Sequence, residues 1–175
     1  MSVLFGASAL ASSPGPPAPG MPAPPFSSRR LDGGTVALES LRGRVVLLDF
    51  WAVECPPCRI EMPELEKIHR RYSGRGLRVL GVTEMDPARD RVARFVAEIG
   101  VTYPVLLDPG ARIGALYRIE AHPTTFVIDA RGIVCFVNVG YLKGEEKEID
   151  RAVREALAAG GRHPGAPRGA PGGKP

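Results

Sequence analysis

Hydrophobic residues fall along this chain in short runs, separated by stretches in which apolar and charged residues recur with helical spacing. The runs predict five strands, at residues 45–50, 77–83, 105–107, 124–129 and 133–139. The first run, Val-Val-Leu-Leu-Asp-Phe, is almost continuously apolar, which is typical of a central strand buried on both faces. The last two runs are separated only by Ala130-Arg131-Gly132, which predicts a hairpin.

The intervening stretches predict four helices, at residues 55–72, 87–99, 111–117 and 145–159. In the longest, Ile60, Leu65 and Ile68 are expected to form the face that packs on the core. Pro63 lies within the same helix and is expected to kink it, because proline removes a hydrogen bond and clashes with the preceding turn. Pro87 suits the first turn of the second helix, where its missing N–H is not needed.

Strands and helices therefore alternate, which predicts an α/β fold with a sheet covered on both faces. Before the first central strand, residues 26–31 and 35–38 are two short stretches that could pair. Asp32-Gly33 lies between them, and Asp-Gly favours a hairpin turn because glycine tolerates a positive φ.

The two ends of the chain differ from its middle. Residues 1–25 combine an apolar, signal-like start with a Pro-rich linker, and residues 160–175 form a Gly/Pro-rich tail that is expected to be disordered. The folded domain is predicted at residues 26–159. The start resembles a signal peptide that ends in an Ala9-x-Ala11 cleavage site, although the first basic residue is Arg29. We expect an extracytoplasmic protein, periplasmic or membrane-tethered, with a cytoplasmic location as the alternative.

Size and charge narrow the possible functions. A domain of this length can bury a core that is stable without structural disulfides or metals. The net charge of the 175-residue chain is +4, and no basic stripe interleaved with aromatic residues suggests nucleic-acid binding. We expect a monomer that binds no nucleic acid and holds no metal or cofactor.

The residues best suited to chemistry are Cys55 and Cys58, in Cys-Pro-Pro-Cys, where the first central strand gives way to a helix. Two intervening residues let the sulfurs meet within one helical turn, so a disulfide can form and break there. The start of a helix favours a thiolate. We expect Cys55, at the helix tip, to be exposed and to act as the nucleophile, and Cys58 to be shielded and to resolve the mixed disulfide.

Two carboxylates could serve this pair as a base. Asp49 is a lone acid in an apolar strand, where burial would raise its pKa toward neutral pH. Glu61 follows Cys58 by one helical turn on the same face. The alternatives are a strand-end Asp49 that faces solvent and a Glu61 that only suits the helix dipole.

Longer motifs surround this pair. They are Trp51-Ala52-x-x-Cys55-Pro56-Pro57-Cys58-Arg59, Glu61-Met62-Pro63-Glu64-Leu65, Tyr103-Pro104-Val105-Leu106-Leu107-Asp108 and Pro123-Thr124-Thr125-Phe126-Val127-Ile128-Asp129. Together they resemble the TlpA/ResA-like branch of the thioredoxin superfamily over about residues 20–158. The resemblance implies a thioredoxin-like fold, with a central mixed sheet flanked by helices and an N-terminal β-hairpin. It also implies a thiol–disulfide oxidoreductase that reduces disulfides in extracytoplasmic protein clients, for example in cytochrome c maturation.

The same resemblance assigns further roles. Pro123 would follow His122 in a cis peptide bond and face the cysteines, and its loop would bind a client's extended chain. The expected client-binding residues are Trp51, Pro56, Pro57, His122, Pro123 and Thr124. Electrons would come from a thiol donor, which in this family is usually bound to the membrane. The family usually has Trp where this chain has Glu54, whose charge disfavours a thiolate on Cys55, whereas a protonated His122 would favour one.

Other functions remain open at this point. The pair could instead oxidise or isomerise client disulfides. It could also carry Cu(I), with Met62, Met85 or His122 as further ligands. Structural zinc lacks a second pair of ligands, and haem attachment lacks a His after Cys58. The remaining cysteine, Cys135, lies in a predicted strand and is expected to be a small buried residue rather than a reactive thiol.

Overall fold

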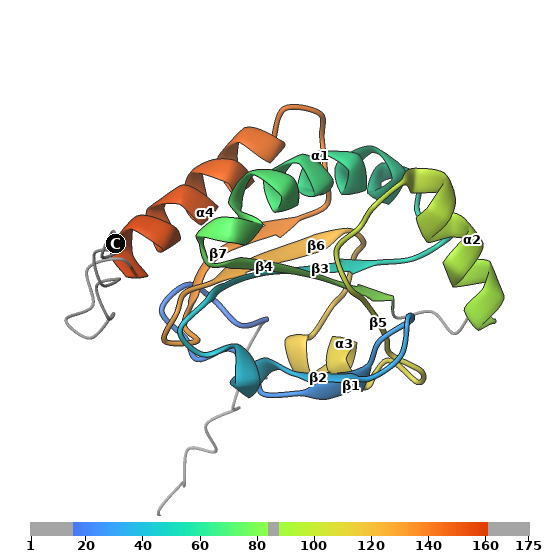
Figure 1. The fold of residues 1–175 in the computed structure, drawn as a ribbon, viewed down its shortest axis with the longest axis horizontal. Coiled ribbons are helices and arrows are strands. Elements are labelled where there is room, and N and C mark those ends of the chain that lie inside the picture. Colours follow the sequence, from blue (N-terminus) through green and yellow to red (C-terminus); the bar gives the residue numbers. More distant parts are fainter. Residues whose placement is uncertain (1–15, 84–87, 161–175) are drawn as a thin grey trace, which may run out of the picture.

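The computed structural model describes residues 16–83 and 88–160 (Figure 1). The signal-like segment, the first part of the Pro-rich linker, Met85, Pro87 and the tail beyond residue 160 lie outside the described residues. The expectations that concern them stay predictions.

A five-stranded mixed sheet forms the centre of the domain, in the order β5-β4-β3-β6-β7. Its strands are β3 (Val45–Trp51), β4 (Leu77–Thr83), β5 (Val105–Leu107), β6 (Thr124–Ile128) and β7 (Val134–Val139). β3, β4 and β5 are parallel, whereas β6 and β7 are antiparallel to their neighbours. Every residue of β3 is buried, as its apolar run predicts. β3 is the central strand, so its carboxyl end leaves the sheet between the ends of β4 and β6.

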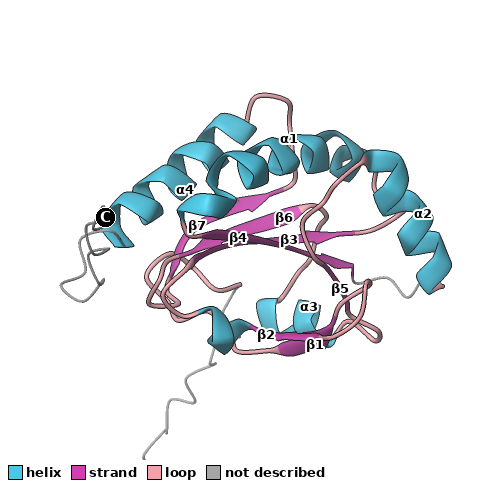
Figure 2. Cartoon of the chain, in the orientation of Figure 1, coloured by secondary structure: helices cyan, strands magenta, loops and turns pink. Residues whose placement is uncertain are grey.

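Helices cover both faces of this sheet, in the layers that Figures 1 and 2 show. α1 (Pro56–Tyr72), α2 (Arg89–Ile99) and α4 (Glu146–Gly160) lie on one face, and α3 (Arg112–Tyr117) lies on the other. α1 continues through Pro63. Within the described ranges, no helix has both the length and the apolar character needed to cross a bilayer.

The face with α3 also carries the predicted hairpin, formed by β1 (Ser27–Arg29) and β2 (Thr35–Ala37). Arg29 pairs with Thr35, so Asp32-Gly33 lies inside a loop of residues 30–34 rather than forming a two-residue turn. Gly33 and Gly34 both have positive φ, 103° and 77°, a conformation that glycine adopts without steric penalty.

Residues 20–23 lie along the start of β7, before the predicted start of the domain at Phe26. The Gly20 N–H donates to the Val134 carbonyl at 2.8 Å, and the Val134 N–H donates to the Met21 carbonyl at 2.9 Å. Ala23 is buried. The packed part of the chain therefore extends into the stretch whose composition indicates a linker.

Side chains alternate along β3 between two apolar layers. Leu47 and Trp51 pack beneath α1, α2 and α4, whereas Leu48 and Phe50 pack on the side of α3, where Phe50 contacts Tyr117. One expectation for α1 is wrong, because Ile60 is 54% exposed. The buried positions of this helix are Cys58, Glu61, Met62, Leu65, Glu66, Ile68 and Tyr72, and Ile60 lies outside that stripe.

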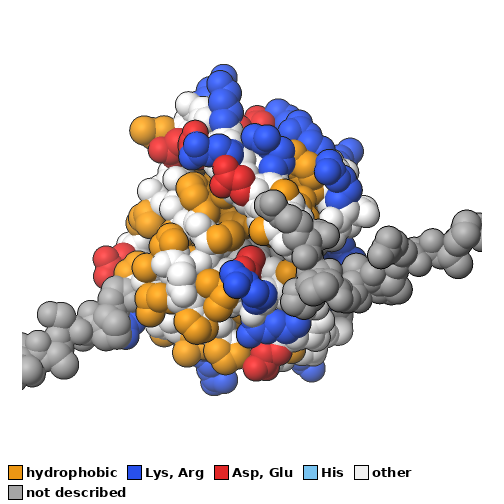
Figure 3. All heavy atoms as spheres, turned by 90° about the vertical axis from the view of Figure 1, so that its left-hand side faces the viewer, with side chains coloured by type: hydrophobic (Ala, Val, Ile, Leu, Met, Phe, Trp, Pro, Cys, Tyr) orange, Lys and Arg blue, Asp and Glu red, His pale blue; other side chains and the backbone are white. Residues whose placement is uncertain are grey.

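Figure 3 shows the end of the molecule that lies away from the start of α1. Lys and Arg side chains gather there over the helix layer, above a band of hydrophobic side chains. Several of the arginines in this layer are paired with acids, for example Arg71 and Arg154 with Asp150. The surface of the helix layer is therefore of mixed charge.

Candidate redox site

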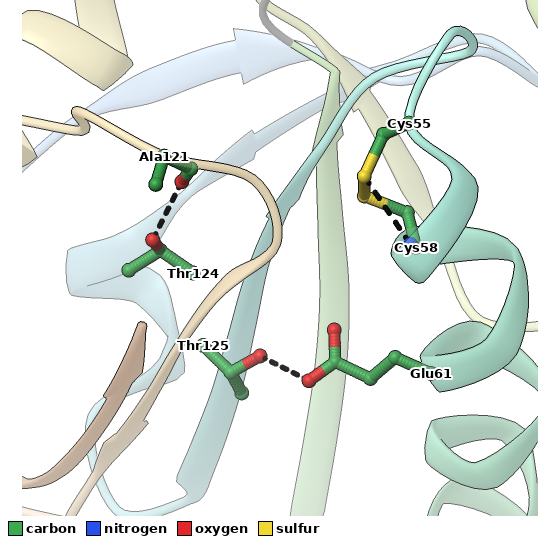
Figure 4. The surroundings of a disulfide bond; sticks show 6 residues. All are labelled: Cys55, Cys58, Glu61, Ala121, Thr124 and Thr125. Carbon is green, nitrogen blue, oxygen red and sulfur yellow. Dashed lines mark hydrogen bonds between the residues drawn. A yellow bond between two sulfur atoms is a disulfide. The ribbon is translucent and has the colours of Figure 1, made fainter. Parts of the chain in front are cut away.

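Cys55 and Cys58 lie where the chain leaves the sheet and enters α1, and a disulfide joins them (Figure 4). Their Cα atoms are 5.3 Å apart. Cys55 is the N-cap of the helix, and its sulfur accepts a hydrogen bond of 3.2 Å from the Cys58 N–H. Pro56 follows as the first helical residue, where no N–H is needed. The helix start thus presents a backbone donor to the Cys55 sulfur.

The two cysteines differ in exposure in the expected direction. Cys58 is fully buried, and Cys55 retains 8% of its surface. Cys55 is therefore less exposed than its place at the helix tip predicts, because its sulfur points inward to the disulfide and the preceding loop packs around it.

Asp49 lies on the same side of β3 as Trp51 and is fully buried. Neither of its carboxylate oxygens has a hydrogen-bond partner among the described residues. Burial raises the pKa of Asp49 well above its usual range, and the nearby Glu61 raises it further. This placement corrects the alternative in which Asp49 faces solvent.

Glu61 is also fully buried, on the face of α1 that packs on the sheet. Its Oε1 accepts a hydrogen bond of 3.0 Å from the Thr125 hydroxyl, which Figure 4 shows below the disulfide. Burial raises the pKa of Glu61 to about 8, against the lowering effect of the Thr125 bond and with a further increase from Glu145. Glu61 is therefore a protonated acid at neutral pH rather than an ordinary first-turn carboxylate.

Two residues to which sequence reasoning assigned no role contribute to this buried site. Thr125 lies on β6 opposite Asp49 on β3, and its hydroxyl holds Glu61. Tyr103 is buried, and the charges of Asp49 and Glu61, together with burial, raise the pKa of its hydroxyl. Strand alternation could have placed Thr125 on the helix-facing side, but only the pairing of β6 with β3 brings it to Glu61.

The loop before β6 faces the disulfide (Figure 4). The His122–Pro123 peptide bond is cis, as the resemblance implies. The Thr124 hydroxyl donates to the Ala121 carbonyl at 2.7 Å, and the Pro123 carbonyl accepts a 2.7 Å bond from the Gly140 N–H. Thr124 is buried, so its side chain supports the loop, and a contact of that side chain with a client stays a prediction.

The other expected client-binding residues divide by exposure. Pro56 is exposed, and Pro57 and His122 are half-buried. Trp51 is fully buried, with its ring stacked on Phe95 at 5.1 Å. This corrects the expectation that Trp51 contacts a client, because no part of it reaches the surface in the oxidised form.

Cys135 is not the buried residue that the sequence predicts. It lies on the edge strand β7, is exposed, and donates from its sulfur to the Val127 carbonyl at 3.2 Å. Desolvation of the sulfur, together with Asp129, raises the pKa of the thiol to about 11. Cys135 is therefore a thiol, not a thiolate, near neutral pH.

A copper site of the proposed kind finds little support in this geometry. Met62 is fully buried in the core, and Met85 lies outside the described residues. Over the described ranges, His, Cys, Asp and Glu side chains do not gather in groups of three or more that could hold a metal ion.

Comparison with known proteins agrees with this geometry. The AhpC/TSA family matches residues 19–137. The thioredoxin-like protein YneN of Bacillus subtilis is 36% identical over 131 residues, which cover 74% of this chain and 76% of that protein. The thiol-disulfide oxidoreductase ResA of Bacillus thuringiensis is 33% identical over 129 residues, 74% of each chain. A thioredoxin-family thiol:disulfide interchange protein from Chlorobium tepidum has a similar structure, with a TM-score of 0.68 at 32% identity over 83% of this chain and 99% of that one.

Fold, paired cysteines and relatives therefore agree. The chain belongs to the AhpC/TSA family and is a thioredoxin-fold thiol–disulfide oxidoreductase of the ResA type, with Cys55 and Cys58 as its redox pair.

Proposed function

We propose that this protein reduces disulfides in extracytoplasmic protein clients and becomes oxidised at Cys55 and Cys58. The single observation that carries the proposal is the pair of buried acids, Asp49 and Glu61, of which Glu61 follows Cys58 by one helical turn on the buried side of α1. Such groups suit the step in which a buried thiol has to lose a proton before it can attack.

The first step is attack by the Cys55 thiolate on one sulfur of a client disulfide. The bond between the client's sulfurs breaks, a mixed disulfide forms with Cys55, and the released client thiolate takes a proton from solvent. The Cys58 N–H supports the thiolate, because it already donates to the Cys55 sulfur in the oxidised form. Pro56, Pro57 and the loop of His122, Pro123 and Thr124 form the surface that receives the client.

The second step is attack by Cys58 on the Cys55 sulfur. Cys58 is fully buried, so its proton needs an acceptor inside the protein. Glu61 has a pKa of about 8, close to that of a free thiol, and can accept the proton once its own has left. Asp49 acts on the same step, because burial and the charge of Glu61 both raise its pKa and the two carboxylates repel each other. The products are the protein disulfide and a fully reduced client.

The surroundings of Cys55 favour a reductant over an oxidant. Strongly oxidising pairs owe their high potential to a stabilised thiolate in the reduced form. Here the neighbouring residue is Glu54, and the nearby guanidinium groups of Arg59 and Arg91 are engaged by Glu98 and Glu54. The Glu54 charge and the ion pairs of Arg59 and Arg91 thus limit the stabilisation of a Cys55 thiolate, which keeps the contribution of the helix start and one backbone N–H.

The reduction potential of the Cys55–Cys58 couple tests this direction. The protein is equilibrated in dithiothreitol buffers, or in glutathione buffers if it proves oxidising, while the fluorescence of Trp51 is followed. A value near or below about −220 mV supports a reductase, and a value above about −150 mV overturns it in favour of an oxidant or isomerase. A chain with no two-electron transition would not be a redox enzyme.

Location, clients and electron donor complete the proposal. The Ala-rich apolar start favours export, and a reductase in an oxidising compartment needs a thiol donor, which we propose is membrane-bound. Cysteines of cytochrome c haem sites are one class of client that the resemblance suggests. N-terminal sequencing of the mature native protein tests export, and an intact Met1 in a cytosolic fraction would contradict it.

A further inference from the structure

A pocket of about 460 Å³ opens beside Cys55, between the start of α1 and the exposed side of α2. Glu54 and Pro56, the two neighbours of Cys55 in the chain, both line it. Its charged and aromatic lining side chains are Glu54, Arg59, Arg91, Arg94, Phe95 and Glu98. The pocket therefore lies next to the segment that carries Cys55, and it contains three guanidinium groups and two carboxylates.

The arginines of α2 occupy positions that do not favour the helix itself. Arg89, Arg91 and Arg94 lie in its first two turns, with Asp90 as the acid of the first turn. The start of a helix carries partial positive charge, so cations there are unfavourable by a few tenths of a kcal/mol or more. Helix stability alone therefore does not account for Arg89 and Arg91, which lie in the first turn.

Two of the three guanidinium groups in the pocket already have partners. Arg59 forms an ion pair of 2.9 Å with Glu98, and its guanidinium lies 4.7 Å from the centre of the Phe95 ring. Arg91 is paired with Glu54. Arg94 is exposed and has no ion pair in the part of the chain that the structure describes. The pocket thus retains one positive charge in excess.

The pair between Arg91 and Glu54 indicates what the pocket accepts. Glu54 belongs to the loop before Cys55, and its side chain is 70% exposed, so the ion pair with Arg91 is open to solvent. A guanidinium group has five N–H donors and can hold more than one carboxylate oxygen. Arg91 can therefore bind an incoming carboxylate in place of Glu54 or together with it, and Arg94 can bind a carboxylate directly.

We propose that this pocket is a specificity site that binds an Asp or Glu side chain of the client, close in sequence to the client's reacting cysteine. The inference rests on the proposed reduction of protein disulfides. Arg94 is the main binding residue, Arg91 assists, and Phe95 forms the apolar floor. Glu54 and Pro56 flank Cys55 and line the pocket, and an extended strand advances about 3.3 Å per residue, so we place the acid two or three residues from the client cysteine.

Three disulfide-bonded peptides test the proposal. They are identical except for Glu, Gln or Lys two residues from the reacting cysteine. The rate constant for their reduction by the reduced protein is measured at low and high salt, from the fluorescence of Trp51. We expect the Glu peptide to react about three to ten times faster than the Gln peptide at low salt, the Lys peptide to be slowest, and the differences to shrink at high salt.

Two substitutions that remove the same charge distinguish an effect of the pocket from an effect of the protein's net charge. In Arg94→Gln the ratio of the Glu-peptide rate to the Gln-peptide rate should fall toward one. Arg75→Gln removes the same charge from an exposed position after the far end of α1 and should keep the preference. Glu54→Gln removes the ion-pair partner of Arg91. It should therefore increase the rate for the Glu peptide relative to the rate for the Gln peptide.

The outcomes can be told apart. Equal rates for the Glu and Gln peptides with the unmodified protein, or an unchanged preference in Arg94→Gln, would overturn the specificity site while leaving the reductase function in place. A failure to reduce any of the three peptides would overturn the proposed function, and the inference with it.

Discussion

Asp49 on β3 is the register partner of Gly81 on β4, so an acid and a residue without a side chain lie side by side in the middle of the sheet. A Cβ atom at Gly81 would lie 2.8 Å from the Trp51 Nε1 and 3.2 Å from a carbon of the Tyr103 ring. Glycine at this position lets both rings lie against β4 next to Asp49, which shields the carboxyl group from water.

Substituting Gly81 by Ala should disturb this arrangement. The added methyl group meets the indole and phenol rings at less than van der Waals distance, and overpacking of this kind destabilises by about 1–3 kcal/mol. Urea unfolding followed by Trp51 fluorescence measures the loss. Gly74→Ala is the matched control, because a Cβ there meets no atom within 4 Å. Equal stability of the two variants would show that the rings have room to move.

Substituting the two cysteines should separate their roles. Cys55→Ser should abolish client reduction, whereas Cys58→Ser should retain the first attack and accumulate a mixed disulfide. Mass spectrometry after reaction with a disulfide-bonded peptide detects that adduct. Cys135→Ser is the control and should leave turnover unchanged, because its thiol is protonated near neutral pH. Adduct formation by Cys55→Ser would reverse the assignment of nucleophile and resolving cysteine.

Removing the base should change the pH profile of the second step. In the unmodified protein the resolution rate should rise with pH through about 8, as Glu61 loses its proton. Glu61→Gln should slow resolution by about 100-fold or more and abolish that inflection. Stopped-flow fluorescence of Trp51 after mixing with a peptide disulfide measures both effects.

Thr125→Val provides a finer test of the same step. The Thr125 hydrogen bond lowers the pKa of Glu61 because it favours the charged carboxylate. Its loss should move the inflection to higher pH and leave the rate at high pH nearly unchanged. An inflection that stays in place would mean that Glu61 is not the titrating base.

The buried acids should also make stability depend on pH. The pKa of Glu61 is about 8 in the folded protein and 4.5 in the unfolded chain, so between these values the folded state holds more protons. The free energy of unfolding should therefore fall as pH rises from about 4.5 to about 8, by on the order of 5 kcal/mol. Asp49 adds to the same trend.

Urea unfolding of the oxidised protein between pH 5 and pH 9 checks this dependence. Glu61→Gln should flatten it, and Asp49→Asn should be more stable than the unmodified protein at pH 8, because it removes an unpaired buried carboxyl group. A free energy of unfolding that rises from pH 5 to pH 8 would contradict the sign.

Local pattern was enough to predict most elements of this fold. The apolar run of β3, the hairpin of β6 and β7, and the helix that begins at the cysteines all follow from periodicity and turn residues. Ile60 and Cys135 were assigned to the wrong environment because one apolar residue does not reveal which side of a helix or strand meets the core. Sheet register and contacts between elements were beyond local pattern, so the bond from Thr125 to Glu61 and the stacking of Trp51 on Phe95 required the structure.

The docking of residues 20–23 along β7 determines which end of the domain adjoins the N-terminal part of the chain. Those residues meet β7 at Ile133 and Val134, at the end of the strand remote from Gly140, whose N–H holds the Pro123 carbonyl in the loop that faces the disulfide. If the protein is attached to a surface through its N-terminal residues, the attachment point lies at one end of the domain and the cysteines lie at the opposite end. The redox centre would face outward from any surface to which the protein is attached, free to meet clients and donor in turn.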